Sequence, residues 1–117
     1  MRRTFVESAG FSADRARLER DRELSHDDMV ALEQRILAHP ESGDLVPGTG
    51  GLRKIRARQR AVGRGTRGGV RVYYLDLAAR HVTHLVAIFG KREKTDLSMA
   101  ERREVAALVG RLKKEMP

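Results

Sequence analysis

The chain contains no cysteine among its 117 residues. It therefore has no disulfide, no thiolate ligand for zinc and no cysteine nucleophile. It also lacks an apolar run near the roughly 18–20 residues that a membrane-spanning helix needs. Its first residues do not resemble a secretory signal, because charges at Glu7, Asp14 and Arg15 stand where an apolar core is required. We expect a cytoplasmic protein with no membrane partner.

Acidic residues are missing from one long stretch, the 31 residues from Leu45 to Leu75. This stretch holds eight of the 24 basic residues, and the other 16 balance the 16 acidic ones, so the net charge of +8 lies here. A pI near 10.8 indicates polyanions as partners, with nucleic acid first among them. An arginine-rich genome is the alternative account of the arginine excess, but it would not explain why the acids vanish from one stretch.

Capping boxes predict two helices. In each, a serine stands three positions before an acidic residue, a spacing that satisfies two free backbone donors at a helix start. The two pairs are Ser25 with Asp28 and Ser98 with Glu101. Apolar residues then recur at helical spacing, which predicts helices over about 26–38 and 99–115. The charged stretch 12–24 is expected to form a short surface helix or an ordered loop.

Alternation of residue type predicts the strands. Three follow one another at 52–58, 70–77 and 81–89, and a shorter one is expected at Thr4-Phe5-Val6. Strands joined by short connections usually pair antiparallel, so the three form a meander. The first strand returns beside them after the helix. We expect one α+β domain over residues 1–117, with a small, mostly antiparallel sheet and helices on one face.

The predicted strands bring cations together on one surface. Lys54 and Arg56 occupy alternate positions and point to the same side, whereas Arg53 points to the other side with the apolar residues. Arg71, from the next strand, can join Lys54 and Arg56. The acid-free stretch therefore predicts a cationic sheet face as well as a high net charge.

Three strings are specific enough to compare with known families. They are GDLVPGTGGLRKIR at 43–56, GGVRVYY at 68–74, and FGKRE at 89–93 followed by DLS at 96–98. In this order and spacing they resemble the RelE/HigB family of type II toxin–antitoxin toxins, and most closely its HigB-like branch. The resemblance covers nearly the whole chain. It implies a RelE-like microbial RNase fold and an mRNA interferase, a ribosome-dependent endoribonuclease that inhibits translation.

The same resemblance implies the partners. They are a cognate antitoxin of helix-turn-helix type, the ribosome with its messenger and ribosomal RNA, and operator DNA reached only through the antitoxin. An acidic segment of the antitoxin is expected to cover part of the cationic face. The resemblance implies a metal-independent reaction and no cofactor.

RNA cleavage of this type uses the ribose 2′-OH to attack the neighbouring phosphate, so cations must stabilise the charge that develops. Arginine suits this task because its guanidinium binds two phosphate oxygens at once. By the resemblance, Arg71 is the candidate for transition-state stabilisation. Lys91 and Arg92 fall in the string where related toxins carry another functional cation. Lys54 and Arg56 complete the catalytic candidates.

The other central cations are candidates for holding RNA. They are Arg53, Arg58, Arg60, Arg64 and Arg67. Ser98 stands where related toxins often carry a functional tyrosine, so Tyr73 is the candidate for stacking on a base. The general base is left open, since a lysine would need its pKa depressed by cationic neighbours before it could accept a proton.

Two other functions stay open. ParE-like toxins of the same superfamily poison DNA gyrase by protein contact without being enzymes. A plain RNA- or ribosome-binding module would bind with strong salt dependence and without toxicity. The GGLRKI string and the dense cationic face favour the nuclease.

Overall fold

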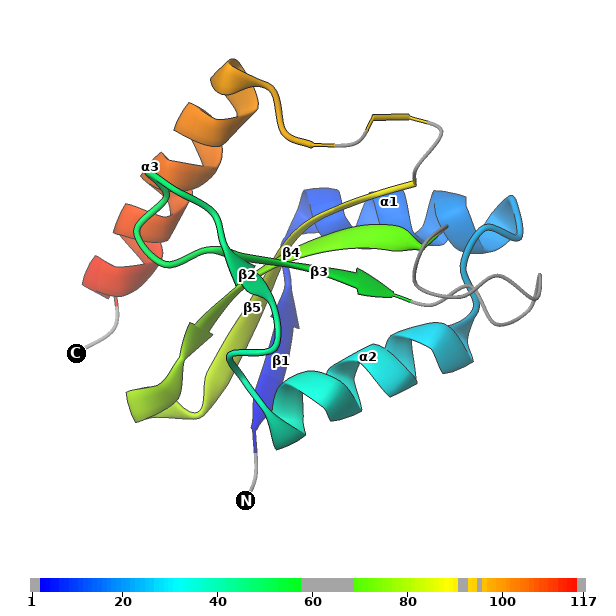
Figure 1. Cartoon of the computed structure of the whole chain (residues 1–117), viewed down its shortest axis with the longest axis horizontal. Helices are drawn as coiled ribbons and strands as arrows, with labels where there is room; N and C mark the ends of the chain where they lie inside the picture. The colour runs from blue at the N-terminus through cyan, green and yellow to red at the C-terminus, as the bar shows by residue number, and fades with distance from the viewer. Residues whose placement is uncertain (1–2, 58–68, 91–92, 95, 116–117) are drawn as a thin grey trace.

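A computed structural model of the chain describes residues 3–57, 69–90, 93–94 and 96–115, and within them a sheet carries helices on both faces (Figure 1). In chain order the elements are β1 (Thr4–Glu7), α1 (Ala9–Arg20), α2 (His26–Ala38), β2 (Asp44–Leu45), β3 (Arg53–Ala57), β4 (Val70–Leu77), the 3₁₀ helix η3 (Ala78–Arg80), β5 (Val82–Phe89) and α3 (Met99–Glu115). None of the helices in these ranges combines the length and hydropathy needed to cross a bilayer.

The strands lie in the order β1-β5-β4-β3-β2. The meander of β3, β4 and β5 is antiparallel as predicted, β2 extends it at one edge, and β1 runs parallel to β5 at the other. Lys54 lies opposite Tyr73 and Arg56 lies opposite Arg71. Directly opposed residues of an antiparallel pair point to the same face. These four side chains therefore share one face of the sheet.

Both predicted capping boxes are present. The Asp28 N–H donates to Ser25 Oγ at 3.0 Å, and the Ser25 N–H donates to Asp28 Oδ2 at 2.9 Å. Ser98 and Glu101 exchange the same two bonds at 2.9 and 3.1 Å. Because each box satisfies free donors of the first turn, α2 and α3 begin at the residue after each serine.

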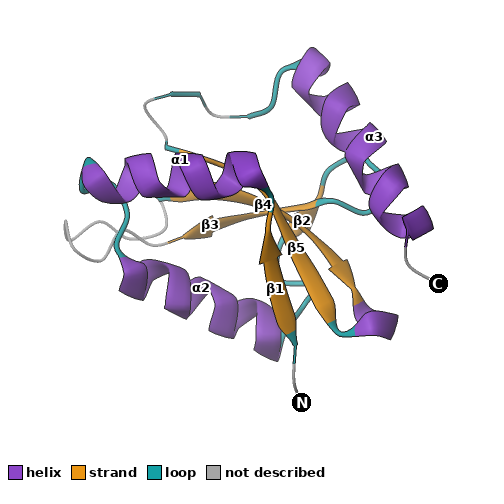
Figure 2. Cartoon of the chain, turned by 180° about the vertical axis from the view of Figure 1, so that it is seen from behind, coloured by secondary structure: helices purple, strands orange, loops and turns teal. Residues whose placement is uncertain are grey.

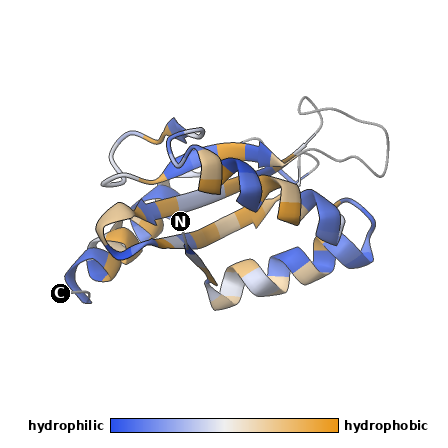
Figure 3. Cartoon of the chain, turned by 90° about the horizontal axis from the view of Figure 1, so that it is seen from below, coloured by the Kyte–Doolittle hydropathy of each residue, from blue (hydrophilic) through white to orange (hydrophobic). Residues whose placement is uncertain are grey.

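The helices α1 and α2 cover one face of the sheet (Figure 2). Their inward side chains meet alternate residues of β3 and β4, and two residues of β5 on either side of a register shift, in an apolar core. Its buried members are Phe11, Leu18, Leu24, Met29, Leu32, Ile36, Ile55, Ala57, Val70, Val72, Tyr74, Leu85 and Ile88. Figure 3 shows hydrophobic colour concentrated along the strands, with hydrophilic segments alternating along the helices.

The helix α3 packs on the opposite face over a smaller core. Its buried members are Val46, Leu52, Tyr73, Leu75, Val86, Phe89, Leu97 and Val109. The expectation that all helices lie on one face is wrong. Tyr73 and Leu75 of β4 are about as buried as Val72 and Tyr74, which alternate with them along the strand, so both faces of this strand require a cover.

Two elements differ from the sequence prediction. The helix α1 begins at Ala9 because Ser8 caps it, with the Phe11 N–H donating to Ser8 Oγ at 3.1 Å. Among its residues only Phe11 and Leu18 are buried, which is why its apolar pattern is weak. The strand β2 is two residues long, too short for alternation to reveal it. The described part of the strand predicted at 52–58 is β3.

Glycines in the string at 43–56 are required by the backbone conformation and by close packing. Gly50 and Gly51 have φ of 75° and 120°, which side chains other than glycine rarely adopt. Lys113 of α3 donates to the Gly50 carbonyl, so this turn is fastened to α3. A Cβ on Gly43 would lie 2.8 Å from Cε1 of Tyr74, and the Gly43 N–H donates to the Tyr74 hydroxyl at 2.9 Å. The string therefore links β2 to β4 and α3.

Candidate nucleic-acid interface

The sheet face on which α3 packs also carries Lys54, Arg56 and Arg71, and we call these three residues the cationic face. Lys54 and Arg56 come from β3, and Arg71 lies directly opposite Arg56 on β4. Alternation along the two strands predicts this arrangement, and the structure has it. Arg56 is exposed and Lys54 is partly exposed, so a ligand can reach both from solvent.

Arg71 is the buried member of the cationic face, with 4% of its surface exposed. Its NH1 donates to the Gly69 carbonyl at 2.7 Å, which orients the guanidinium. Burial, and then the charge of Arg56, lower the pKa of Arg71, although a guanidinium stays protonated in proteins. A buried cation beside a second cation is costly to maintain. Such an arrangement is typical of a functional site.

A carboxylate, Asp96, meets the cationic face at Lys54. One of its oxygens, Oδ1, accepts hydrogen bonds from the Tyr73 hydroxyl at 2.6 Å and the Leu97 N–H at 2.8 Å. The other oxygen, Oδ2, lies 3.7 Å from Lys54 Nζ and 3.6 Å from NH2 of Arg102. The hydrogen bond from Tyr73 holds the pKa of Asp96 below its usual value, and the Leu97 N–H and the two cations act in the same direction.

Sequence reasoning did not select Asp96 or Arg102 as site residues. Asp96 belongs to the DLS string that contributes to the family resemblance, and this is the only signal that pointed to its position. Arg102 is one of two adjacent arginines near the start of α3, and spacing does not show which of them faces the sheet. Their meeting depends on where α3 packs.

The structure contradicts the stacking role expected for Tyr73. Its side chain is fully buried, its ring lies 5.5 Å from that of Phe89 between centroids, and its hydroxyl donates to Asp96. Burial, and then the bond to Asp96, raise the pKa of Tyr73. Tyr73 therefore stays protonated, and its hydroxyl holds Asp96 in place. Its ring cannot stack on a base because α3 and the residues before it cover the ring.

Arg53 is the remaining candidate within the described residues apart from Tyr73, and it does not join the cationic face. Arg53 lies on the opposite face, where its NH1 donates to the Gly43 carbonyl at 2.8 Å. The other candidates lie outside the described residues, and their roles stay predictions. They are Arg58, Arg60, Arg64, Arg67, Lys91 and Arg92.

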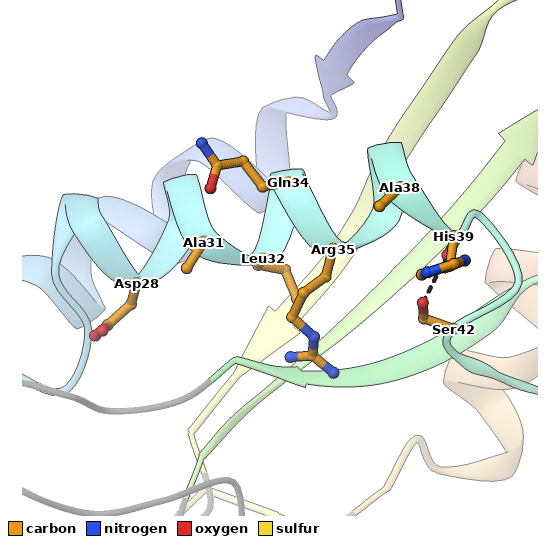
Figure 4. Close-up of a pocket in the computed structure, with 8 residues that line it drawn as sticks. All are labelled: Asp28, Ala31, Leu32, Gln34, Arg35, Ala38, His39 and Ser42. Carbon is orange, nitrogen blue, oxygen red and sulfur yellow. Dashed lines mark hydrogen bonds between the residues drawn. The ribbon is translucent and has the colours of Figure 1, made fainter.

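Among the pockets lined by described residues, two bear on the site candidates. A pocket of about 220 Å³ lies at the edge of the cationic face, lined by Asp44, Leu45, Val46, Pro47, Lys54, Asp96 and Arg102. A larger one, of about 520 Å³, follows α2 (Figure 4). There Arg35 extends toward β3 and donates to the Arg56 carbonyl at 2.8 Å. Arg35 thereby supports the backbone of Arg56 from the other side of the sheet.

A metal site is not formed by the part of the chain described here. In these ranges, no three His, Asp or Glu side chains lie close enough together to hold an ion.

The fold places the chain in a class of small α+β domains built on a mostly antiparallel sheet. No protein-family model matches it. Its structure is similar to that of E. coli toxin RelE, solved in the free state as a double arginine-to-alanine mutant, with a TM-score of 0.51 and 16% sequence identity. The alignment covers 100% of both chains. The predicted RelE-like α+β fold is confirmed, and the HigB-like branch stays a prediction.

Proposed function

We propose that this protein is the toxin of a toxin–antitoxin pair and that it cleaves messenger RNA within the ribosome. The observation that carries the proposal is the buried guanidinium of Arg71, placed opposite Arg56 on a sheet with the RelE fold. Two cations side by side, without a carboxylate bound to Arg71 in the described structure, suit a ligand that brings negative charge. A phosphodiester is such a ligand.

The proposed reaction is a transesterification. The ribose 2′-hydroxyl gives up its proton as its oxygen attacks the adjacent phosphorus. The bond from phosphorus to the 5′-oxygen breaks, and the 5′-oxygen takes up a proton, so protons balance over the step. The products are a 2′,3′-cyclic phosphate and a free 5′-hydroxyl. Negative charge builds on the nonbridging oxygens in the transition state, which is where fixed cations accelerate the step.

Arg71 suits the stabilising role better than the other cations of the face. A guanidinium has five N–H donors, and the bond to the Gly69 carbonyl uses one of them. Its burial places the guanidinium in a setting where electrostatic attraction to a phosphate is strengthened. Arg56 and Lys54 are more exposed, so they are better placed to hold the phosphates on either side of the reacting one.

The experiment combines purified protein, translating ribosomes and a defined message. We expect the wild type to cut the message and Arg71→Ala to abolish cutting. Arg111→Ala, which removes an exposed charge from α3, should cut at the normal rate. Thermal unfolding of each variant checks that it folds.

Each alternative function predicts a different result, either in the cutting experiment or in a companion assay. Cutting that survives Arg71→Ala would remove Arg71 from the mechanism. Inhibition of gyrase supercoiling without any cutting would favour the ParE-like function. Salt-dependent RNA binding without cutting and without toxicity on expression would favour a plain binding module.

The proposed partner is an antitoxin whose acidic segment covers part of the cationic face. We expect coexpression with such a partner to restore growth and to block cutting. Raising the ionic strength should weaken the complex if charge contributes to it. A complex that leaves the cationic face open to RNA would contradict this binding mode.

A further inference from the structure

The contacts of Asp96 leave two cations incompletely paired. Its Oδ1 is held by the Tyr73 hydroxyl and the Leu97 N–H, at 2.6 and 2.8 Å. Its Oδ2 lies 3.7 Å from Lys54 and 3.6 Å from Arg102, which is longer than a hydrogen bond. Among the described residues, Lys54 and Arg102 are thus held to Asp96 at ion-pair distance and donate no hydrogen bond to it. Both side chains are partly exposed, so their N–H donors can turn to a ligand.

The position of these residues connects them to the cationic face. Lys54 belongs both to that face and to the pocket of about 220 Å³ between β2 and α3. The pocket has apolar walls at Leu45, Val46 and Pro47 and cations at its sheet and helix sides. A strand of RNA lying across Arg56 and Arg71 would continue past Lys54 into it.

We propose that Lys54 and Arg102 form a second phosphodiester-binding subsite for single-stranded RNA, and that Asp96 sets its affinity as a fixed internal anion. This inference rests on the proposed action on RNA. The carboxylate lowers the attraction of the subsite for any polyanion. The subsite then holds a phosphate firmly only when the neighbouring phosphate lies on Arg56 and Arg71.

Asp44 also lines the pocket and offers a matched comparison. It lies opposite Lys54 across β2 and β3, but it is exposed and forms no ion pair with Lys54 in the described structure. An exposed carboxylate is screened by water and salt. Removing the charge of Asp44 should therefore matter less than removing that of Asp96.

The test measures binding without cleavage. The probe is a fluorescein-labelled 2′-O-methyl oligoribonucleotide, which lacks the attacking hydroxyl, and the readout is fluorescence anisotropy at several salt concentrations. We expect Asp96→Asn to tighten binding by about two- to fivefold, a range typical of partly exposed charges. Asn keeps an oxygen acceptor for Tyr73 and Leu97, so the fold is retained. Asp44→Asn should change the affinity less.

A second pair of variants tests the subsite from the cationic side. Arg102→Gln should weaken binding by about two- to fivefold and reduce the log–log salt slope by about 0.7, the loss of one phosphate contact on a single strand. Arg103→Gln removes the same charge from the neighbouring exposed position of α3, and it should leave the slope nearly unchanged.

The outcomes separate the subsite from the enzyme. Equal effects of Arg102→Gln and Arg103→Gln, or of Asp96→Asn and Asp44→Asn, would overturn the subsite, because net charge alone would explain binding. The same variant pattern for polyglutamate but none for the oligonucleotide would assign the pocket to an acidic protein segment and overturn it too. The expected pattern without ribosome-dependent cutting would support the subsite and contradict the nuclease.

Discussion

The two faces of the sheet differ in cover and in content. Under α1 and α2, the described part of the chain packs a core of thirteen buried residues, all apolar or aromatic. Under α3 the core has eight, and the same strands present Lys54, Arg56 and Arg71 there. Successive residues of β3 and β4 thus point in turn to the apolar core under α1 and α2 and to the face that carries the cations. A slip of one residue in register would exchange the two roles.

The contrast extends to the helices. Within the described residues of α3, Val109 is the one that is buried, whereas α2 buries Met29, Leu32 and Ile36. A shallowly packed helix leaves part of its sheet face to charged groups. The molecule concentrates its apolar burial on one side, and this leaves the other free to hold cations close together.

The largest expected effect is on stability, and it tests whether the α1/α2 face dominates folding. Leu32 is almost fully buried in the larger core, whereas Leu112 of α3 is partly buried. Leu32→Ala should lower the free energy of unfolding by about 2–5 kcal/mol, and Leu112→Ala by less. Urea denaturation measures both. Equal losses would show that the faces contribute alike.

The next prediction compares two arginines on opposite faces. Arg71→Lys keeps the charge but loses the planar fork of donors, so cleavage of a translated message should slow by about 10²–10³-fold. Arg53→Lys, on the face away from Lys54, should leave the rate near that of the wild type. If both variants cleave at the same rate, the cationic face is not where the chemistry occurs.

Two neighbouring tyrosines allow a finer comparison. Tyr73→Phe removes the hydroxyl that donates to Asp96 and should lower the free energy of unfolding by about 1 kcal/mol. Tyr74→Phe leaves the buried Gly43 N–H without its acceptor and should lower it by about 1–3 kcal/mol. The pKa of Asp96, followed by NMR, should rise in Tyr73→Phe and stay unchanged in Tyr74→Phe. A rise in both would mean that the faces are coupled.

The smallest effect is a pH dependence. The pKa of Asp96 is lower in the folded protein than its usual value near 3.9. Its contribution to stability is therefore complete above that value and is lost as the pH falls through the folded pKa. Asp96→Asn should be less stable than the wild type at pH 7, and the difference should shrink below about pH 4. Thermal unfolding across this range measures it, and a constant difference would contradict the assignment.

Local signals predicted the parts of the fold that depend on near neighbours. Ser25 with Asp28 and Ser98 with Glu101 are three residues apart, so the helix starts follow from the chain itself. The meeting of Lys54, Arg56 and Arg71 needs only alternation and a pairing of consecutive strands. These are the features that the structure confirms.

Features that depend on long-range packing were not predictable in the same way. Tyr73 lies on the same face of the sheet as the cations, and alternation does not show whether that face is exposed to solvent or covered by another element. Its burial follows from α3 and Leu97 packing over it. The cluster of Asp96 with Arg102 has the same origin, since its members come from the segment before α3 and from its first turns.

The pairing of β1 with β5 has a consequence for how the protein is made. Thr4 aligns with Val82 and Glu7 with Leu85, so β1 pairs with a strand that is synthesised after α1, α2 and the strands β2 to β4. Contacts this distant in the chain slow folding. We expect β1 to stay unpaired until the residues of β5 have left the ribosome that translates them. A nascent copy would then complete its sheet only after all the strands between β1 and β5 have been synthesised.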